Sequence, residues 1–388
     1  MTKYADIIIV GGGVMGSSLA YHLLNEGYTG KVVVCEKDKL YEFASTPRSA
    51  GGIRQLFTCD INIQISKFSL SKYQTFPKDM AINGEPAEID FKQRGYLFLA
   101  KQTSLPHLKE QMTLQHKYDV PSRLLNKNEL LEIIPELKTD DLAGGLYCEE
   151  DGYLDPYSVM QGYARKARHL GATYVYRGVE TILTDRNGIY GIRLENGELL
   201  YTKKVINCAG PWAAALSEKI NLPLPVVPLK RQVIKFDIAE PLLNKLPLTI
   251  DPTGVYFRHE GDALISGFSE KVKPGYDFSW KRSFFEEQLW PVLAQRIPNF
   301  ERAKVQGGWA GLYSFNTIDQ NAIIGKHPEL SGYYLACGFS GHGMQQAPAV
   351  GKCLAELLMT GNYQTLDLSP LRMERFKEND LIIEKAIV

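Results

Sequence analysis

The sequence feature that most constrains this fold is a glycine-rich turn between an apolar run and a helical pattern near the N-terminus. Residues 7–10 are Ile-Ile-Ile-Val, and Gly11 to Gly16 then fit the pattern G-x-G-x-x-G. Apolar residues of 14–26 recur on one helical face, and Gly27 ends this helix. A second apolar run, 31–36, completes a strand–helix–strand unit. This unit predicts an α/β fold with a parallel sheet that binds a dinucleotide.

The three motif glycines have separate physical roles. Gly11 permits the tight turn, Gly13 lets the backbone approach a pyrophosphate, and Gly16 lets the helix pack on the strand. The N-terminus of that helix offers N–H groups and a positive dipole to the anion. Glu36 ends the second strand, where a carboxylate accepts hydrogen bonds from ribose hydroxyls. The complete unit outweighs the alternative of a merely structural loop, but it does not separate FAD from NAD.

Charge balance and cysteine spacing narrow the class of protein. The 388 residues contain 44 Lys plus Arg and 44 Asp plus Glu, which argues against nucleic acid as the main partner. The six cysteines form no C-x-x-C pair, which favours reduced thiols over a metal site or a disulfide framework. No leader sequence is evident, and no apolar stretch reaches the ~20 residues that cross a bilayer. We therefore expect a cytoplasmic protein without a metal or transmembrane segment; peripheral association with the inner membrane is the alternative.

Turn residues mark further elements of the α/β pattern. Asp155-Pro156 is typical of a helix start, with the aspartate as N-cap, and Gly171 ends that helix. Asn187-Gly188 and Asn196-Gly197 are two-residue turns that predict successive hairpins. Residues 205–210, Val-Ile-Asn-Cys-Ala-Gly, form an apolar run that enters a small-residue turn.

Two segments differ from this pattern and indicate a second domain. Residues 81–141 and 225–304 are richer in aromatic residues, prolines and alternating strand patterns. We expect them to form an α+β substrate domain built on a largely antiparallel sheet. The Rossmann-like domain then comprises residues 1–80, 142–224 and 305–388, so that the two domains are interleaved.

Two glycine-bearing segments bear on the identity of the cofactor. Residues 44–55 form a small, polar loop with two arginines, suited to a flat cofactor and an anionic substrate. Residues 337–345, Cys-Gly-Phe-Ser-Gly-His-Gly-Met-Gln, resemble the flavin-contacting turn of the D-amino-acid oxidase superfamily, especially sarcosine oxidases and dimethylglycine dehydrogenases. Residues 205–210 are similar to the middle FAD motif of that superfamily, and 311–325 to the segment over the flavin ring. The resemblance implies FAD as the cofactor.

Within this superfamily, three segments resemble the FAD-dependent oxidoreductase domain-containing proteins linked to assembly of mitochondrial complex I. These are residues 315–321, 341–348 and 365–370. The resemblance covers essentially the whole chain and is weakest between 78 and 144. Those proteins carry a presequence, and its absence here suggests a bacterial relative.

The resemblance and the dinucleotide motif together give the expected FAD contacts. They are Gly11, Gly13, Gly16, Glu36, Lys37, Ser45, Thr46, Arg48, Ala50, Gly51, Gly52, Val179, Ala209, Gly210, Gly311, Gly338, Ser340, Gly341, His342, Gly343, Met344 and Gln345. FAD is expected to be non-covalent, because Arg48 occupies the position of the flavin-linked histidine of dimethylglycine dehydrogenase. No cysteine stands near Gly311, the position of the flavin-linked cysteine of sarcosine oxidase.

The resemblance also assigns catalytic roles. Arg54 matches the arginine that binds the substrate carboxylate, a task that suits the paired donors of a guanidinium; a surface salt bridge is the alternative. Gln345 replaces a lysine that binds the same carboxylate in sarcosine oxidase, and Tyr313 stands where glycine oxidases have an arginine. Tyr256 matches a pocket tyrosine. His342 is expected to be a neutral hydrogen-bonding residue, with general base as the alternative.

These roles imply oxidation of the C–N bond of a secondary or tertiary amino acid, such as a sarcosine-, dimethylglycine- or proline-like substrate, by hydride transfer to FAD. Ile265 replaces the lysine that activates oxygen, so a dehydrogenase that passes electrons to a quinone or an electron-transfer protein is favoured over an oxidase that uses oxygen. One alternative is a flavoprotein that acts as an assembly or scaffolding factor for a respiratory complex. An NAD-dependent dehydrogenase is the other, and the turn at 337–345 argues against it.

Overall fold

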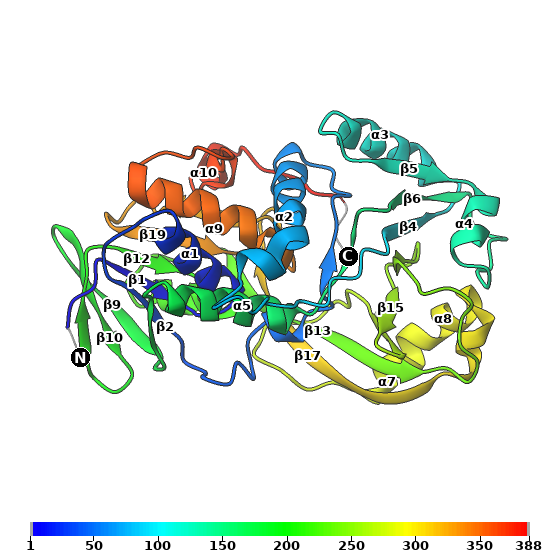
Figure 1. The fold of residues 1–388 in the computed structure, drawn as a ribbon, viewed down its shortest axis with the longest axis horizontal. Coiled ribbons are helices and arrows are strands. Elements are labelled where there is room, and N and C mark those ends of the chain that lie inside the picture. Colours follow the sequence, from blue (N-terminus) through cyan, green and yellow to red (C-terminus); the bar gives the residue numbers. More distant parts are fainter. Residues whose placement is uncertain (1–2, 386–388) are drawn as a thin grey trace.

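The computed structural model describes residues 3–385, which form two units lying side by side (Figure 1). One unit is built on a six-stranded sheet and the other on an eight-stranded sheet. The expected Rossmann-like domain joined to an α+β domain on a largely antiparallel sheet is confirmed.

The six-stranded sheet is parallel apart from one edge strand. Its order is β18 (Ile323–Lys326), β19 (Tyr333–Cys337), β12 (Val205–Asn207), β1 (Ile7–Val10), β2 (Val32–Cys35) and β8 (Thr173–Val175). In the central β1, Ile9 pairs with Ile206 on one side and with Val34 on the other, whereas β18 runs antiparallel to β19. Both β1 and β2 are fully buried, and burial on both faces explains their unbroken apolar runs.

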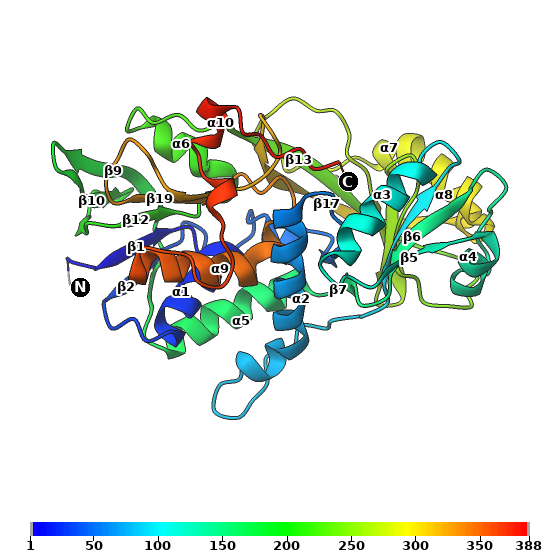
Figure 2. The same cartoon turned by 90° about the horizontal axis from the view of Figure 1, so that it is seen from above.

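Different layers cover the two faces of this sheet. Helices α1 (Val14–Asn25), α5 (Pro156–His169) and α9 (Gly343–Thr360) pack on one face. On the other face lie α6 (Ala213–Glu218) and the antiparallel strands β9 (Val179–Asp185), β10 (Gly188–Leu194) and β11 (Leu199–Tyr201). Asp155 caps α5 by accepting from the backbone N–H of Tyr157, and both expected hairpins form. Figure 2 shows α1, α5 and α9 next to one another.

The eight-stranded sheet carries the second unit. Its order is β17 (Lys304–Asn316), β13 (Val226–Asp237), β16 (Ala263–Gly267), β15 (Tyr256–Glu260), β14 (Leu248–Ile250), β4 (Tyr96–Ala100), β6 (Gly144–Cys148) and β5 (Ser122–Leu125). Its helices are α3 (Leu105–His116), α4 (Lys127–Ile133), α7 (Arg282–Phe284) and α8 (Trp290–Arg296). The long β13–β17 ribbon extends from the second unit to the first (Figure 1).

The sheet pairing bears on the expected domain boundaries at 142 and 305. Strands β6 and β17 fall in the segments assigned to the FAD-binding domain, but they pair with β4 and β13 in the eight-stranded sheet. Cross-strand hydrogen bonds decide where a strand belongs, and they are not visible in a composition change along the chain. We propose that β6 and β17 belong to the substrate domain and that the division otherwise stands.

Helix α2 (Asp60–Asp79), which the sequence patterns did not reveal, stands between the two units (Figure 2). Its Tyr73 hydroxyl donates to the carbonyl of Met344 in the first turn of α9. Near the C-terminus, α10 (Arg375–Glu378) is anchored by a buried ion pair, with Arg375 Nε 2.8 Å from Asp319 Oδ2. These contacts fix the position of the turn that precedes α9.

Candidate active site

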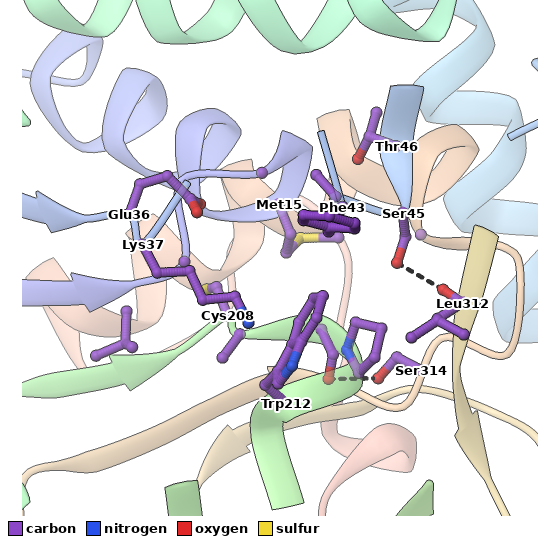
Figure 3. Close-up of a pocket in the computed structure, with 18 of the residues that line it drawn as sticks. Met15, Glu36, Lys37, Phe43, Ser45, Thr46, Cys208, Trp212, Leu312 and Ser314 are labelled. Atoms are coloured by element: carbon purple, nitrogen blue, oxygen red, sulfur yellow. Dashed lines mark hydrogen bonds between the residues drawn. The ribbon is translucent and has the colours of Figure 1, made fainter. Parts of the chain in front are cut away.

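A cavity of about 290 Å³ lies at the carboxyl ends of β1, β2 and β12. Ligands of parallel α/β sheets bind at this edge because the strands and the helix N-termini converge there. Figure 3 shows Glu36 and Lys37 on one side of the cavity and Ser45 on the other. Ser45 Oγ donates to the carbonyl oxygen of Leu312 at 2.6 Å, which ties the arginine-bearing loop to β17.

The motif glycines have the geometry that a dinucleotide requires. A Cβ on Gly11, whose φ is +100°, would lie 2.4 Å from the carbonyl oxygen of Cys208, and a Cβ on Gly16 would lie 2.0 Å from that of Gly11. A Cβ on Gly13 would meet nothing closer than Thr46 Oγ1 at 4.0 Å, because Gly13 faces the cavity. Gly11 and Gly16 therefore serve the turn and the packing, and Gly13 leaves space for a ligand.

Glu36 is held at the end of β2 by two backbone donors. Its Oε2 accepts from Gly12 N at 2.8 Å and its Oε1 from Asp38 N at 2.9 Å. Burial raises the pKa of Glu36 from its usual value, and these two hydrogen bonds oppose that shift. The carboxylate is thus oriented in the cavity wall with lone pairs left to accept ribose hydroxyls.

A second cavity, of about 100 Å³, continues the first toward the eight-stranded sheet. Residues that line both cavities are Ser45, Ser49, Leu312, Tyr313, Gly341 and Met344. The antiparallel pair β3 (Gly52–Ile53) and β7 (Gly152–Tyr153) supports the arginine-bearing loop, residues 44–55, which contributes to the walls of both cavities. The shared wall makes this one continuous site, with a nucleotide end and a small polar end.

Arg54 and His342 form a buried pair at the polar end. Arg54 is 3% exposed; its Nη1 donates to the carbonyl of Leu56 at 2.9 Å, and its Nη2 lies 3.3 Å from His342 Nε2. The Arg54 guanidinium also lies over the Phe57 ring, 4.1 Å from the centroid. Burial, and then the charge of Arg54, lower the pKa of His342 to about 3. His342 is therefore neutral, and its Nε2 can accept from Arg54.

Gln345 and Tyr256 approach the same end from different elements. Gln345 Oε1 accepts from the backbone N–H of Arg54 at 3.1 Å, so this side chain holds the arginine loop against α9. Tyr256, on β15, lines the cavity opposite α9. The Tyr256 hydroxyl lies against Gly267 of β16, since a Cβ added to Gly267 would be 2.4 Å from that hydroxyl. Burial raises the pKa of Tyr256, so its hydroxyl stays protonated.

Nearly all residues expected from the sequence come together at these cavities. The nucleotide cavity is lined by Gly11, Gly13, Glu36, Lys37, Ser45, Thr46, Val179, Ala209, Gly210, Gly341, Gly343 and Met344. The polar cavity is lined by Arg48, Ala50, Gly51, Gly52, Arg54, Tyr256, Gly311, His342 and Gln345, besides the shared residues. Gly16, Gly338 and Ser340 line neither one. Ser340 Oγ instead accepts from Asn316 N at 3.0 Å, and Gly338 N donates to Ser314 Oγ at 3.0 Å, which shapes the turn before α9.

The structure also shows cavity residues that the sequence patterns did not reveal. Trp212 lines the nucleotide cavity, and Lys37 Nζ lies 3.3 Å from its ring centroid (Figure 3). Arg231 of β13 lines the polar cavity together with Tyr96 and Tyr313. Arg231 stands between Lys230 and Gln232, and strand alternation alone does not say which of these side chains faces the cavity.

Comparison with known proteins identifies this arrangement. Residues 6–357 match the protein family described as FAD dependent oxidoreductase. The chain belongs to this family. It is 36% identical to FAD-dependent oxidoreductase domain-containing protein 1 of Xenopus laevis, over 99% of this chain and 85% of that protein. It is 29% identical to human mitochondrial sarcosine dehydrogenase over 92% of this chain, which corresponds to 40% of that longer protein.

Solved structures with the same fold support the family assignment. The L-proline dehydrogenase of P. horikoshii superposes with a TM-score of 0.89, at 29% identity, and covers 98% of this chain and 100% of that chain. The glycine oxidase of Geobacillus kaustophilus gives a TM-score of 0.84 at 25% identity and covers 96% of this chain and 99% of that chain. The expected resemblance to the D-amino-acid oxidase superfamily and FAD as cofactor are confirmed.

The residues present fit FAD. The open space beside Gly13 would admit a pyrophosphate, the carboxylate of Glu36 could accept from a ribose, and the N-terminus of α9 would favour an electron-rich ring edge. Among residues 3–385 there is no group of three His, Cys, Asp or Glu side chains that could hold a metal ion. Over the same range, no helix has both the length and the apolar character to cross a membrane.

We predict that FAD is bound without a covalent link. Cys35 and Cys208 both line the nucleotide cavity, but burial raises the pKa of Cys35 to about 12 and also raises that of Cys208, so neither supplies a thiolate nucleophile. Acid precipitation should release all of the yellow colour into the supernatant. Flavin that stays with the pellet after washing would contradict this prediction.

Proposed function

We propose that this protein oxidises the C–N bond of a secondary or tertiary amino acid and acts as a dehydrogenase rather than an oxidase. The observation that carries the proposal is the buried Arg54 guanidinium at the polar end of an FAD site. A buried arginine at such a place suits an anionic substrate, because its donors can meet both carboxylate oxygens. The relatives named for sarcosine and L-proline dehydrogenation support this substrate class.

The chain's own residues bind and orient the substrate. When bound, FAD accepts the hydride from the carbon next to the amine nitrogen. Arg54 binds the carboxylate, and Gln345 and Leu56 fix the arginine through the two hydrogen bonds described above. Tyr256 and Tyr313 close the cavity on the side of the sheet, which limits access of water and places the amine. His342 stays neutral and supports Arg54 rather than removing a proton.

The preference for a dehydrogenase rests on Ile265. This side chain is fully buried on β16, where Ile265 pairs with Arg258 and Gly267 pairs with Tyr256. Directly opposed residues of an antiparallel pair share a face, so Ile265 lies on the same face of the sheet as Tyr256. An aliphatic side chain at this place does not stabilise superoxide.

Anaerobic reduction tests the proposal. Purified protein is mixed without oxygen with sarcosine, N,N-dimethylglycine, L-proline, the dicarboxylate iminodiacetate, glycine or D-alanine, and the flavin absorbance is followed. We expect bleaching by at least one secondary or tertiary amino acid, followed by slow recovery in air and fast recovery with a soluble quinone. If none of these amino acids bleaches the flavin, an assembly or scaffolding role for the flavoprotein becomes the better account. Rapid recovery in air would contradict the dehydrogenase proposal.

The lowered pKa of His342 leads to a separate prediction about how substrate binding depends on pH. A histidine with its pKa lowered to about 3 stays neutral from pH 5 to pH 9, so its titration cannot shape substrate binding in that range. Burial raises the pKa of Asp151, which accepts from the backbone N–H of Gln55 next to Arg54, to about 7, so we expect that carboxyl to contribute an inflection near neutral pH. We expect His342→Gln to weaken binding at every pH without moving any inflection. Loss of an inflection in this variant would show that His342 titrates.

A further inference from the structure

Arg231 gives the polar cavity a second positive group besides the Arg54–His342 pair. It lies on β13, where it pairs with Gly311 of β17, and both residues line the cavity. Its guanidinium lies 5.1 Å from the centroid of the Tyr313 ring. Its Nε is buried and has no hydrogen-bond partner among residues 3–385, which leaves a donor unused in the cavity region. Burial lowers the pKa of Arg231, but an arginine remains charged.

Acidic side chains near Arg231 are committed to other partners. Glu270 Oε1 accepts from Gln232 Nε2 at 2.7 Å, and Arg231 Nη1 donates to the backbone carbonyls of Lys230 at 2.9 Å and Glu270 at 3.3 Å. Asp277 forms an ion pair with Lys230 at 2.5 Å. Among residues 3–385, no carboxylate forms an ion pair with Arg231 within 4.0 Å. A largely desolvated guanidinium without a carboxylate partner is costly, so a bound anion would be favoured there.

The lining of the polar cavity as a whole also has positive side chains without negative ones. Its described lining includes Arg48, Arg54 and Arg231 but no Asp or Glu. Arg48 is used by the protein, because its Nε and Nη1 donate to the carbonyls of Glu42 and Ala310 at 2.6 and 2.7 Å. Arg231 differs from Arg48 because its buried Nε has no hydrogen-bond partner among residues 3–385. A substrate with one carboxylate, bound by Arg54, would leave Arg231 without a carboxylate partner.

Arg54 and Arg231 act on the same cavity from different sides. The Arg231 guanidinium lies 5.1 Å from the centroid of the Tyr313 ring, whereas the Arg54 guanidinium lies 5.8 Å from the centroid of the Tyr96 ring. Tyr313 lies on β17 and Tyr96 on β4, which are not neighbours in the sheet, so the two guanidinium groups contact different parts of it. This arrangement suits two separated anions better than one carboxylate shared by two arginines.

We propose that the substrate carries a second carboxylate, which Arg231 binds while Arg54 binds the first. The substrate class is then a small secondary or tertiary amino acid with two carboxylates, and the cavity of about 100 Å³ limits its size. This inference rests on the proposed function and adds the specificity that the second cation provides. Arg231 is a specificity-determining residue of the site.

Binding of unreactive analogues tests the inference without turnover. The FAD-loaded protein is titrated with (methylthio)acetate, thiodiacetate and 3-(carboxymethylthio)propionate, in which sulfur replaces the amine nitrogen, and the change in the flavin spectrum gives Kd. We expect one of the two dicarboxylates to bind at least about 10-fold more tightly than the monocarboxylate. Arg231→Gln should reduce this preference to roughly 3-fold or less, and Arg231→Lys should retain part of it.

Lys235→Gln is the matched control. It removes one positive charge from the same strand, but Lys235 does not line the cavity, so the preference should remain. Equal affinity of wild-type protein for one and two carboxylates would overturn the inference and leave the proposed function intact. An equal loss of both affinities in Arg231→Gln would also overturn it. If none of the three analogues binds, the proposed amino-acid site is wrong, and the inference falls with it.

Discussion

Replacing Arg54 with alanine is expected to raise the amino-acid concentration for half-maximal flavin reduction by roughly 30- to 1000-fold. Removal of a charge-assisted partner from a buried carboxylate costs on the order of 2–4 kcal/mol, which corresponds to this range. Gln345 cannot replace the lost charge, and its side chain is already engaged with the backbone of residue 54. Anaerobic titration with the best amino acid of the panel measures the effect.

Two comparisons make the Arg54 result specific. FAD content should stay near wild type, because the motif glycines and Glu36 lie at the other end of the site. Arg54→Lys should restore binding only in part, since a lysine keeps the charge but loses the paired donors. If Arg54→Ala reduces its flavin as readily as wild type, the carboxylate binds elsewhere and the substrate orientation proposed above is wrong.

Gly13→Val is expected to give a folded protein without FAD, with affinity reduced by roughly 100-fold or more. Gly13 has a φ of −62°, which a valine can adopt, and a Cβ there would have open space on the cavity side. The branched side chain would therefore occupy the space of the pyrophosphate rather than strain the backbone. The ratio of flavin to protein absorbance after purification measures the loss, and circular dichroism checks the fold.

The neighbouring motif glycine offers a contrasting variant. Gly16→Ala places a Cβ 2.0 Å from the carbonyl oxygen of Gly11, so we expect a loss of folding stability as well as of FAD. With all proteins compared in their flavin-free form, a lower melting temperature in Gly16→Ala but not in Gly13→Val would show that Gly16 serves packing and that Gly13 leaves space for the ligand. Stoichiometric FAD in Gly13→Val would show that the pyrophosphate does not approach this residue.

The sequence by itself determined the parts of the protein that depend on local periodicity and backbone chemistry. Strand β1, the glycine turn, α1 and β2 follow from residues 7–36, because the motif joins an apolar strand to a helix over a short distance. The Asp155 cap and the two Asn-Gly hairpins are local in the same sense. The resemblance around 337–345 added FAD, which the dinucleotide motif alone did not distinguish from NAD.

Only the tertiary structure decided which distant segments share a sheet or a cavity. Strand β6 pairs with β4 and β5, and β17 pairs with β13, through hydrogen bonds to segments that are distant in the chain, so no local pattern reveals their domain. Gln345 faces the backbone of Arg54, and Arg231 faces the cavity, because the helix, loop and strand that carry them pack together. Such contacts depend on packing between elements, and the absence of a carboxylate ion pair to Arg231 among residues 3–385 is visible only after the neighbouring carboxylates have been placed.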